Sequence, residues 1–185
     1  PASAGAVTVG IADQSSGTFS DPLFQRLAIK HARLNLAWDA LDYDWQVAEL
    51  DDWMAKANAA GVTPLVIFSQ SRVQGRTRIL PKPAQLGAVV TKLRARYPFV
   101  KEFAAWNEMN YPGQPTFRKP QVVAKYYKAI RANCPGCTVL PGSLLDNPNV
   151  IPWAKRLLKQ IKRLGQPAPT VWGLHNYSDV NRLRD

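Results

Sequence analysis

Short apolar runs alternate along the chain with longer segments in which apolar residues recur every three or four positions. The short runs cover residues 6–11, 32–38, 63–68, 100–106, 138–140 and 170–175, and each has the length of a buried strand. The longer segments cover residues 22–31, 44–60, 83–97, 120–133 and 149–164 and have helical spacing. Asp21 and Pro22 form a typical helix start, and Gly61 and Gly165 follow two helices as usual ending residues. The pattern predicts six strand–helix units, the last without its helix.

Strict alternation of strands and helices predicts a parallel sheet, either open and doubly wound or closed into a barrel. The first strand is followed by residues 10–17, which lack the dinucleotide-binding fingerprint, and no phosphate-binding loop of the Walker type is present. Polar and aromatic residues collect instead just after the strands, where a TIM barrel places its active site. We therefore predict an α/β fold, a (β/α)8 TIM barrel with about six units present, forming one catalytic domain over residues 1–185. A complete barrel takes about 250 residues, so we expect the natural protein to continue.

Composition and charge narrow the possible partners. Hydrophobic residues make up 46% of the chain, and no apolar run has the length of a membrane helix, so we expect no membrane insertion. The net charge of +11 is compatible with an anionic glycan, an anionic cell envelope or nucleic acid. The basic residues are spread over most helical segments, and the densest set, within residues 155–163, has the spacing of a solvated helix face. No nucleic-acid-binding signature accompanies them, so we predict no nucleic-acid partner.

Two cysteines, Cys134 and Cys137, stand in a short segment between a helix and a strand. A thioredoxin-type redox pair follows a strand and opens a helix, which is the reverse order. A zinc site needs about four ligands, and the two histidines are far away in sequence. We therefore predict a disulfide and no metal site. Together with the small residues at positions 1–6, typical of a signal cleavage site, the disulfide predicts a secreted or extracytoplasmic protein.

The end of the fourth apolar run carries the chemistry that stands out most. Glu108 ends this run, and a carboxylate there faces either the core or the mouth of a site, because unpaired burial is costly. Partial burial beside Trp106 favours the neutral carboxyl that a general acid needs. Asn107 can both donate and accept hydrogen bonds, which suits a sugar hydroxyl. The alternative is a capping or turn role for Asn107 and Glu108.

This strand end resembles the fourth strand of clan A glycoside hydrolases, retaining (β/α)-barrel enzymes that include families 5 and 39. Asn107 and Glu108 match the Asn-Glu pair of that strand, and Asn110 fits the longer Asn-Glu-Pro-Asn form of family 39-like members. Met109 stands where the family commonly has proline, so the subfamily is open. The resemblance implies that Glu108 is the catalytic acid/base and that Asn107 binds the hydroxyl beside the anomeric carbon.

Three further positions resemble family motifs. Arg33 resembles the second-strand arginine of family 5-like members, and His175 and Tyr177 resemble the sixth-strand His-x-Tyr. The resemblance implies that Arg33 and Tyr177 hold the nucleophile, and that His175 lines the sugar subsite. In the family the nucleophile is a glutamate on the seventh strand, which is expected beyond residue 185. No metal or organic cofactor is implied.

Trp38 and Asp39 are further substrate-binding candidates on chemical grounds. Trp38 is a candidate sugar-stacking platform because it is followed directly by Asp39 at the end of the second run, although tryptophans are more often core residues. Trp106 and Trp172 are the less favoured alternatives. His31 is predicted to lie in a helix tail without a catalytic role.

These observations favour a retaining O-glycoside hydrolase that acts on a poly- or oligosaccharide. The alternative is a non-catalytic, carbohydrate-binding relative with the same barrel. A basic surface-adhesion or nucleic-acid-binding domain is a third, weaker interpretation.

Overall fold

A computed structural model of the chain describes residues 8–177. The strands are β1 (Ile11–Ala12), β2 (His31–Ala37), β3 (Thr63–Ser69), β4 (Glu102–Ala104), β5 (Thr138–Leu140), β6 (Ser143–Leu145) and β7 (Gly173–His175). The α-helices are α1 (Pro22–Arg26), α2 (Asp44–Ala59), α3 (Pro83–Arg96), α4 (Pro120–Asn133) and α5 (Val150–Arg163). Two 3-10 helices, η1 (Ser16–Ser20) and η2 (Ala40–Asp42), follow β1 and β2.

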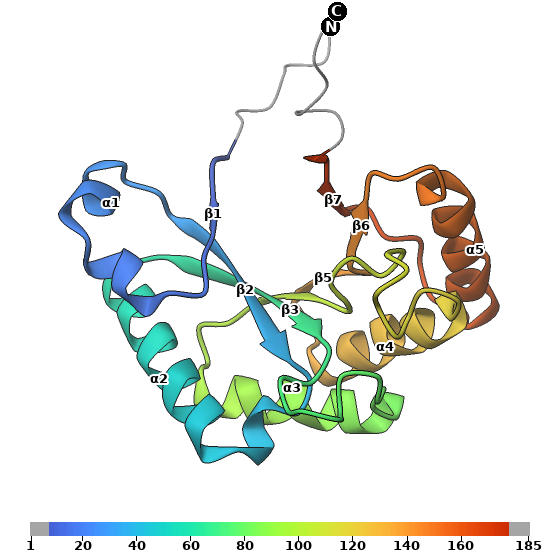
Figure 1. The fold of residues 1–185 in the computed structure, drawn as a ribbon, viewed down its shortest axis with the longest axis horizontal. Coiled ribbons are helices and arrows are strands. Elements are labelled where there is room, and N and C mark those ends of the chain that lie inside the picture. Colours follow the sequence, from blue (N-terminus) through green and yellow to red (C-terminus); the bar gives the residue numbers. More distant parts are fainter. Residues whose placement is uncertain (1–7, 178–185) are drawn as a thin grey trace, which may run out of the picture.

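All strand pairs in the described residues are parallel. One sheet has the order β1-β2-β3-β4-β5, and β6 pairs with β7 in a second, smaller sheet. The strands follow an arc with the helices on its outer side, as a right-handed parallel crossover requires (Figure 1). The predicted α/β class with a parallel sheet is therefore confirmed. Within residues 8–177 the arc stays open, because β1 and β7 are not paired with each other.

The strand path from Thr138 to Leu145 is broken in its middle, which the sequence pattern did not predict. Pro141 has no N–H to donate to a neighbouring strand, and Gly142 has a φ of 137°. A Cβ atom at Gly142 would lie 2.3 Å from the main-chain oxygen of Trp106. Glycine is therefore required here for both conformation and space. The chain resumes as β6, a strand that the prediction of a single run over residues 138–140 missed.

The first helix is shorter than predicted. α1 ends at Arg26, and Ala28 adopts a φ of 53°, a left-handed conformation that a continuing α-helix excludes. His31 therefore starts β2 instead of ending the helix, so its predicted place in a helix tail is wrong. The chain needs these residues to reverse direction before entering the sheet.

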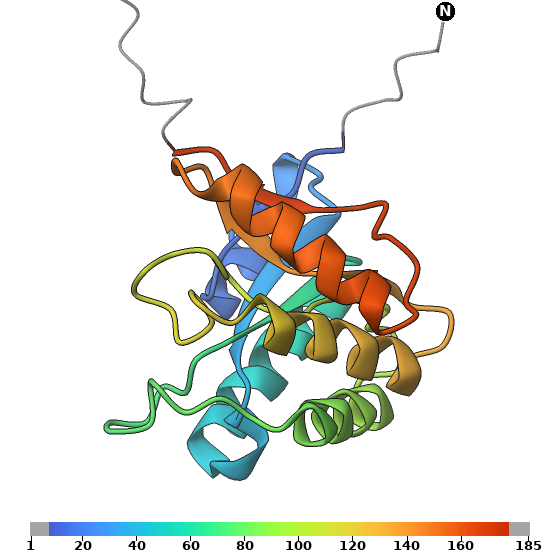
Figure 2. The ribbon, with the colours of Figure 1, turned by 90° about the vertical axis from the view of Figure 1, so that its right-hand side faces the viewer.

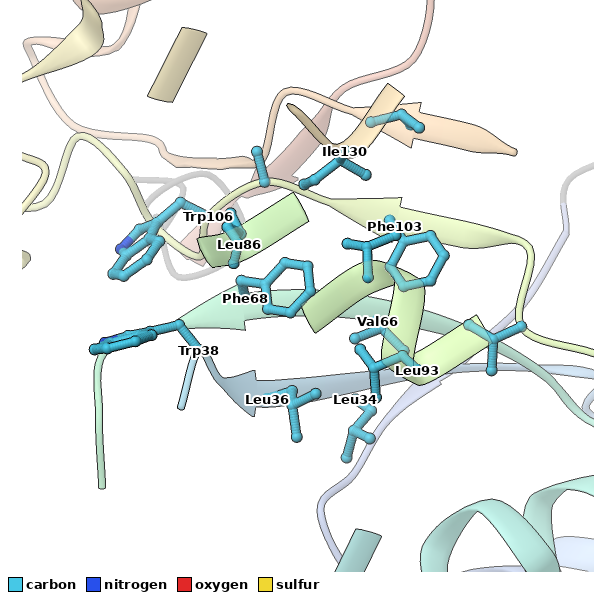
Figure 3. Close-up of a cluster of buried hydrophobic side chains, with 14 of the residues drawn as sticks. Leu34, Leu36, Trp38, Val66, Phe68, Leu86, Leu93, Phe103, Trp106 and Ile130 are labelled. Atoms are coloured by element: carbon cyan, nitrogen blue, oxygen red, sulfur yellow. The ribbon is translucent and has the colours of Figure 1, made fainter. Parts of the chain in front are cut away.

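Alternation along the strands separates two apolar layers. Leu34, Leu36, Val66 and Phe68 point outward and pack against the helices. Figure 3 shows them with Phe103 of β4, Leu86 and Leu93 of α3 and Ile130 of α4. The inward positions Ile67, Ala104 and Leu140 form a separate small cluster with Leu65. The outer layer is the main core, and the inner layer lines the concave side of the arc.

The turn between α4 and β5 carries the predicted disulfide, which links Cys134 to Cys137. Gly136, inside this four-residue turn, has a φ of 81°, which glycine adopts at no steric cost. The disulfide prediction is confirmed. Among the residues described, no helix combines the length and the apolar composition needed to cross a bilayer.

Candidate functional site

Three side chains from separate strands meet at the candidate site. His175, the last residue of β7, has its Nδ1 atom 2.8 Å from Oε1 of Glu108, which follows β4. The Nε2 atom of the same ring contacts Nη1 of Arg33 in β2. The side chains of His175 and Glu108 are only 10% and 21% exposed. The structure therefore brings together three of the residues that the sequence singled out.

The groups on either side of the His175 ring have complementary hydrogen-bonding roles. A guanidinium group can only donate, so Nε2 of His175 accepts from Arg33. The ring proton then sits on Nδ1 and is donated to the carboxylate of Glu108. The imidazole ring thus connects Arg33 to Glu108.

The backbone at Glu108 is held in an uncommon conformation. Its φ is 45°, in the left-handed region that residues with a Cβ atom rarely adopt. The N–H of Glu108 donates to Oγ of Ser143 over 2.9 Å, and the same hydroxyl donates to Oδ1 of Asn107 over 3.2 Å. The N–H of Met109 donates to the main-chain oxygen of Ser143 over 3.0 Å. The start of β6 therefore clamps the turn that presents Glu108, and it offsets the local strain.

Asn110 holds two segments of the chain together through hydrogen bonds of its side chain. It is completely buried, its Nδ2 donates to the main-chain oxygen of Leu145 over 2.8 Å, and its Oδ1 accepts from the N–H of Leu145 over 2.7 Å. The same Nδ2 lies 3.0 Å from the side-chain oxygens of Asn147 and Asn149, and Nδ2 of Asn149 donates back to the main-chain oxygen of Asn110. These hydrogen bonds connect the loop that carries Glu108 to the segment before α5.

A cavity of about 500 Å³ occupies the concave side of the arc. Its polar wall includes Arg33, Ser143, His175 and Tyr177, and its apolar floor includes Ile67 and other inward residues of the sheet. The rings of His175 and Tyr177 lie with their centroids 5.6 Å apart, and Tyr177 is half exposed. The cavity is therefore polar along Arg33, His175 and Tyr177 and apolar at its base, a combination typical of small-molecule sites.

Trp38 and Asp39 lie apart from this cluster. Trp38 points to the same outer face of the sheet as Leu34 and Leu36, because every second residue of a strand faces the same side. It is only 6% exposed and packs in the core shown in Figure 3. Asp39 is buried and pairs with Arg76, whose Nε lies 3.2 Å from Oδ2. In this position the Trp38 ring has no open face for a sugar, so the structure does not support the predicted stacking role. The alternation of residues 34, 36 and 38 was the sequence signal for this burial.

Two further findings concern metal binding and a residue that the sequence did not single out. Within residues 8–177, no group of three or more His, Cys, Asp or Glu side chains is placed to hold a metal ion. Sequence reasoning missed Ser143, the residue that clamps Glu108. Its only sequence signal was the Pro141–Gly142 break that precedes it.

Comparison with known proteins gives a likeness of fold. No protein-family model matches the sequence, and no curated protein is significantly similar to it. Solved structures of glycoside hydrolases are similar. A glucosidase from Croceicoccus marinus has a TM-score of 0.60 at 14% identity, over 82% of this chain and 38% of its own.

Two further glycoside hydrolases show the same relation. A family 51 α-L-arabinofuranosidase from Bifidobacterium longum has a TM-score of 0.59 at 14% identity, over 89% of this chain and 40% of its own. A fungal β-1,4-galactanase has a TM-score of 0.56 at 14% identity, over 84% of this chain and 60% of its own. The chain thus spans less than two thirds of these structures. At such identities the comparison establishes the α/β fold with its parallel sheet and leaves the chemistry to be argued from the site.

Proposed function

We propose that the protein is a retaining O-glycoside hydrolase that acts on a poly- or oligosaccharide, with Glu108 as general acid and base. The observation that carries the proposal is the position of the Glu108 carboxyl at a strand end, hydrogen-bonded to His175, which contacts Arg33 in turn. The fold shared with several glycoside hydrolases supports it.

The hydrogen bonds suggest how Glu108 works. His175 donates to Oε1, which leaves Oε2 to carry the proton that is delivered to the leaving oxygen and later to take a proton from water. Asn107 binds the hydroxyl beside the anomeric carbon, and Arg33 and Tyr177 hold the nucleophile. Retention requires a second carboxylate as nucleophile, about 5–5.5 Å from the carboxyl of Glu108.

Substitution of Glu108 tests this assignment. We expect Glu108→Ala to reduce hydrolysis of substrates with poor leaving groups by about 100-fold or more, since proton transfer contributes that much. Substrates with a good leaving group should still react in the first step, and added azide should restore turnover and yield a glycosyl azide. Glu102→Ala is the matched control, because Glu102 is the same residue type at the other end of β4. Near-normal activity of Glu108→Ala on poor leaving groups would contradict the proposal.

One observation favours the alternative, a carbohydrate-binding relative without turnover. Among the described residues, the hydrogen-bonded cluster of Arg33, His175 and Glu108 contains one carboxylate, and retaining hydrolysis needs two. If the complete protein bound oligosaccharides, and Glu108→Ala altered binding, but no bond were cleaved, this alternative would hold.

We also propose that the protein works outside the cytoplasm. The Cys134–Cys137 disulfide supports this, since such bonds persist in oxidising compartments. Protein recovered from the culture medium of its host should contain no free thiol before reduction and two afterwards.

A further inference from the structure

A groove of about 730 Å³ lies on the outer side of the molecule, where the start of α4 meets α5. The two helices pack side by side on the face shown in Figure 2. Trp153 of α5 anchors one end, because its Nε1 donates to the main-chain oxygen of Phe117 over 2.7 Å. The groove is thus built on packed helices.

The charge of the groove is entirely positive. Arg118 lines it from the α4 side, and Arg156, Lys159 and Arg163 line it from α5. No carboxylate lines it, and none of these four cations forms an ion pair or side-chain hydrogen bond with any residue between 8 and 177. Unpaired cations that converge on one groove are a site for an anionic ligand.

The charge belongs to a wider asymmetry of the chain. Between Met109 and Tyr177 the only acidic residue is Asp146. The basic residues of that stretch are Arg118, Lys119, Lys125, Lys128, Arg131, Lys155, Arg156, Lys159, Lys162 and Arg163. The carboxylates gather instead around α2, for example Glu49, Asp51 and Asp52. Basic residues therefore predominate in the half of the chain that carries α4 and α5, and carboxylates gather around α2.

The groove also offers neutral groups. The amides of Gln121 and Gln160 line it and can each donate and accept hydrogen bonds, as sugar hydroxyls require. Phe117 contributes a half-buried ring that can pack on the face of a pyranose. The α5 cations stand at positions 156, 159 and 163, so they span about 10 Å along the helix. This spacing suits a polymer with repeated charges better than a single small anion.

We propose that the α4–α5 groove binds a carboxylated polysaccharide, with the Arg and Lys side chains on its uronate carboxylates and the amides on its hydroxyls. The choice of a polysaccharide over another polyanion rests on the function proposed above. The groove is also joined to the candidate site, because Asn149 lines it and hydrogen-bonds to Asn110 in the loop after Glu108. An acidic glycan held here would keep the protein close to its substrate.

Affinity electrophoresis and calorimetry of the protein with polygalacturonate test the proposal, with dextran as the neutral polymer. We expect the protein to bind polygalacturonate and not dextran. Its affinity for polygalacturonate should fall at least about tenfold when the salt concentration rises from about 20 to about 300 mM. Arg156→Gln/Lys159→Gln should weaken binding about tenfold or more, since charge-assisted contacts are lost. The matched control is Lys155→Gln/Lys162→Gln, which removes two charges from the same helix outside the groove and should change binding less than threefold.

Three results would overturn the proposal. The first is an absence of polygalacturonate binding at low salt by a chain whose circular dichroism shows it folded. The second is equal weakening by the groove pair and the control pair, which would mean a general charge effect. The third is tighter binding of double-stranded DNA with the same dependence on Arg156 and Lys159. Binding that depends on Arg156 and Lys159 would support this inference whether or not polygalacturonate is cleaved. Hydrolysis that does not change in Glu108→Ala would refute only the proposed catalysis, and Glu108-dependent hydrolysis without groove binding would refute only this inference.

Discussion

Gly142 connects the fold to the candidate site, and its substitution by alanine gives a sharp test of the structure. A Cβ atom there would lie 2.3 Å from the main-chain oxygen of Trp106 and 3.0 Å from Sδ of Met109, and the residue has a φ of 137°. The conformational strain costs about 1–3 kcal/mol. Relieving the overlap with a main-chain atom costs about another 1–3 kcal/mol. We therefore expect Gly142→Ala to reduce the free energy of unfolding by about 4 kcal/mol.

The measurement is thermal and urea unfolding followed by circular dichroism. For a chain of this size, a loss of about 4 kcal/mol lowers the melting temperature by about 8–16 °C. Gly165→Ala is the control, because Gly165 has a φ of 66° but nothing within 4 Å of the added Cβ atom. It should lose only about 1–2 kcal/mol from the left-handed conformation. If the two variants melted at the same temperature, the close approach of Gly142 to Trp106 would be refuted.

Two further predictions address the clamp and the surface. Ser143→Ala removes the acceptor of the Glu108 N–H, so we expect kcat to fall about tenfold with little change in KM. Ser143→Thr keeps the hydroxyl group and should keep most of the activity. A change in KM alone would contradict this. The hydrogen bonds that Asp51 accepts, first from Arg96 and then from Tyr97, hold the pKa of its carboxyl below the ordinary value. The stabilisation is therefore present above the unfolded pKa and is lost as pH falls through the folded pKa. Urea unfolding should show Asp51→Asn less stable than the wild type at neutral pH, with the difference shrinking below about pH 4; a difference independent of pH would contradict this.

The parallel sheet could be predicted because short apolar runs alternate regularly with segments of helical spacing, which gives a strict strand–helix order. The grouping of Arg33, Glu108 and His175 could be anticipated only in part. Parallel strands place their carboxyl ends at one edge of the sheet. The contacts themselves, however, join residues that are far apart in the sequence: Glu108 and His175 are separated by 67 positions, and Arg33 and His175 by 142. Such pairings depend on the register and curvature of the sheet, which no local pattern encodes.

The errors have local causes. β6 was missed because Pro141 and Gly142 together read as the end of a strand, whereas they form a break within its path. α1 was extended too far because Ala28 is ordinarily a strong helix former, and its left-handed conformation is imposed by the turn into β2. The Trp38 prediction weighed the adjacent Asp39 above the alternation of the strand. In each case tertiary context outweighed the propensity of single residues.

The left-handed backbone of Glu108 has a consequence for how the sequence can change. Residues without a Cβ atom adopt this conformation freely, so Gly at position 108 would relax the turn by about 1 kcal/mol, set against the hydrogen bond lost to His175. A library at this position, screened for heat resistance alone, should therefore enrich glycine and asparagine over alanine and valine. A screen for turnover should retain glutamate. The proposed catalytic role of Glu108 thus predicts that folding and turnover favour different amino acids at position 108.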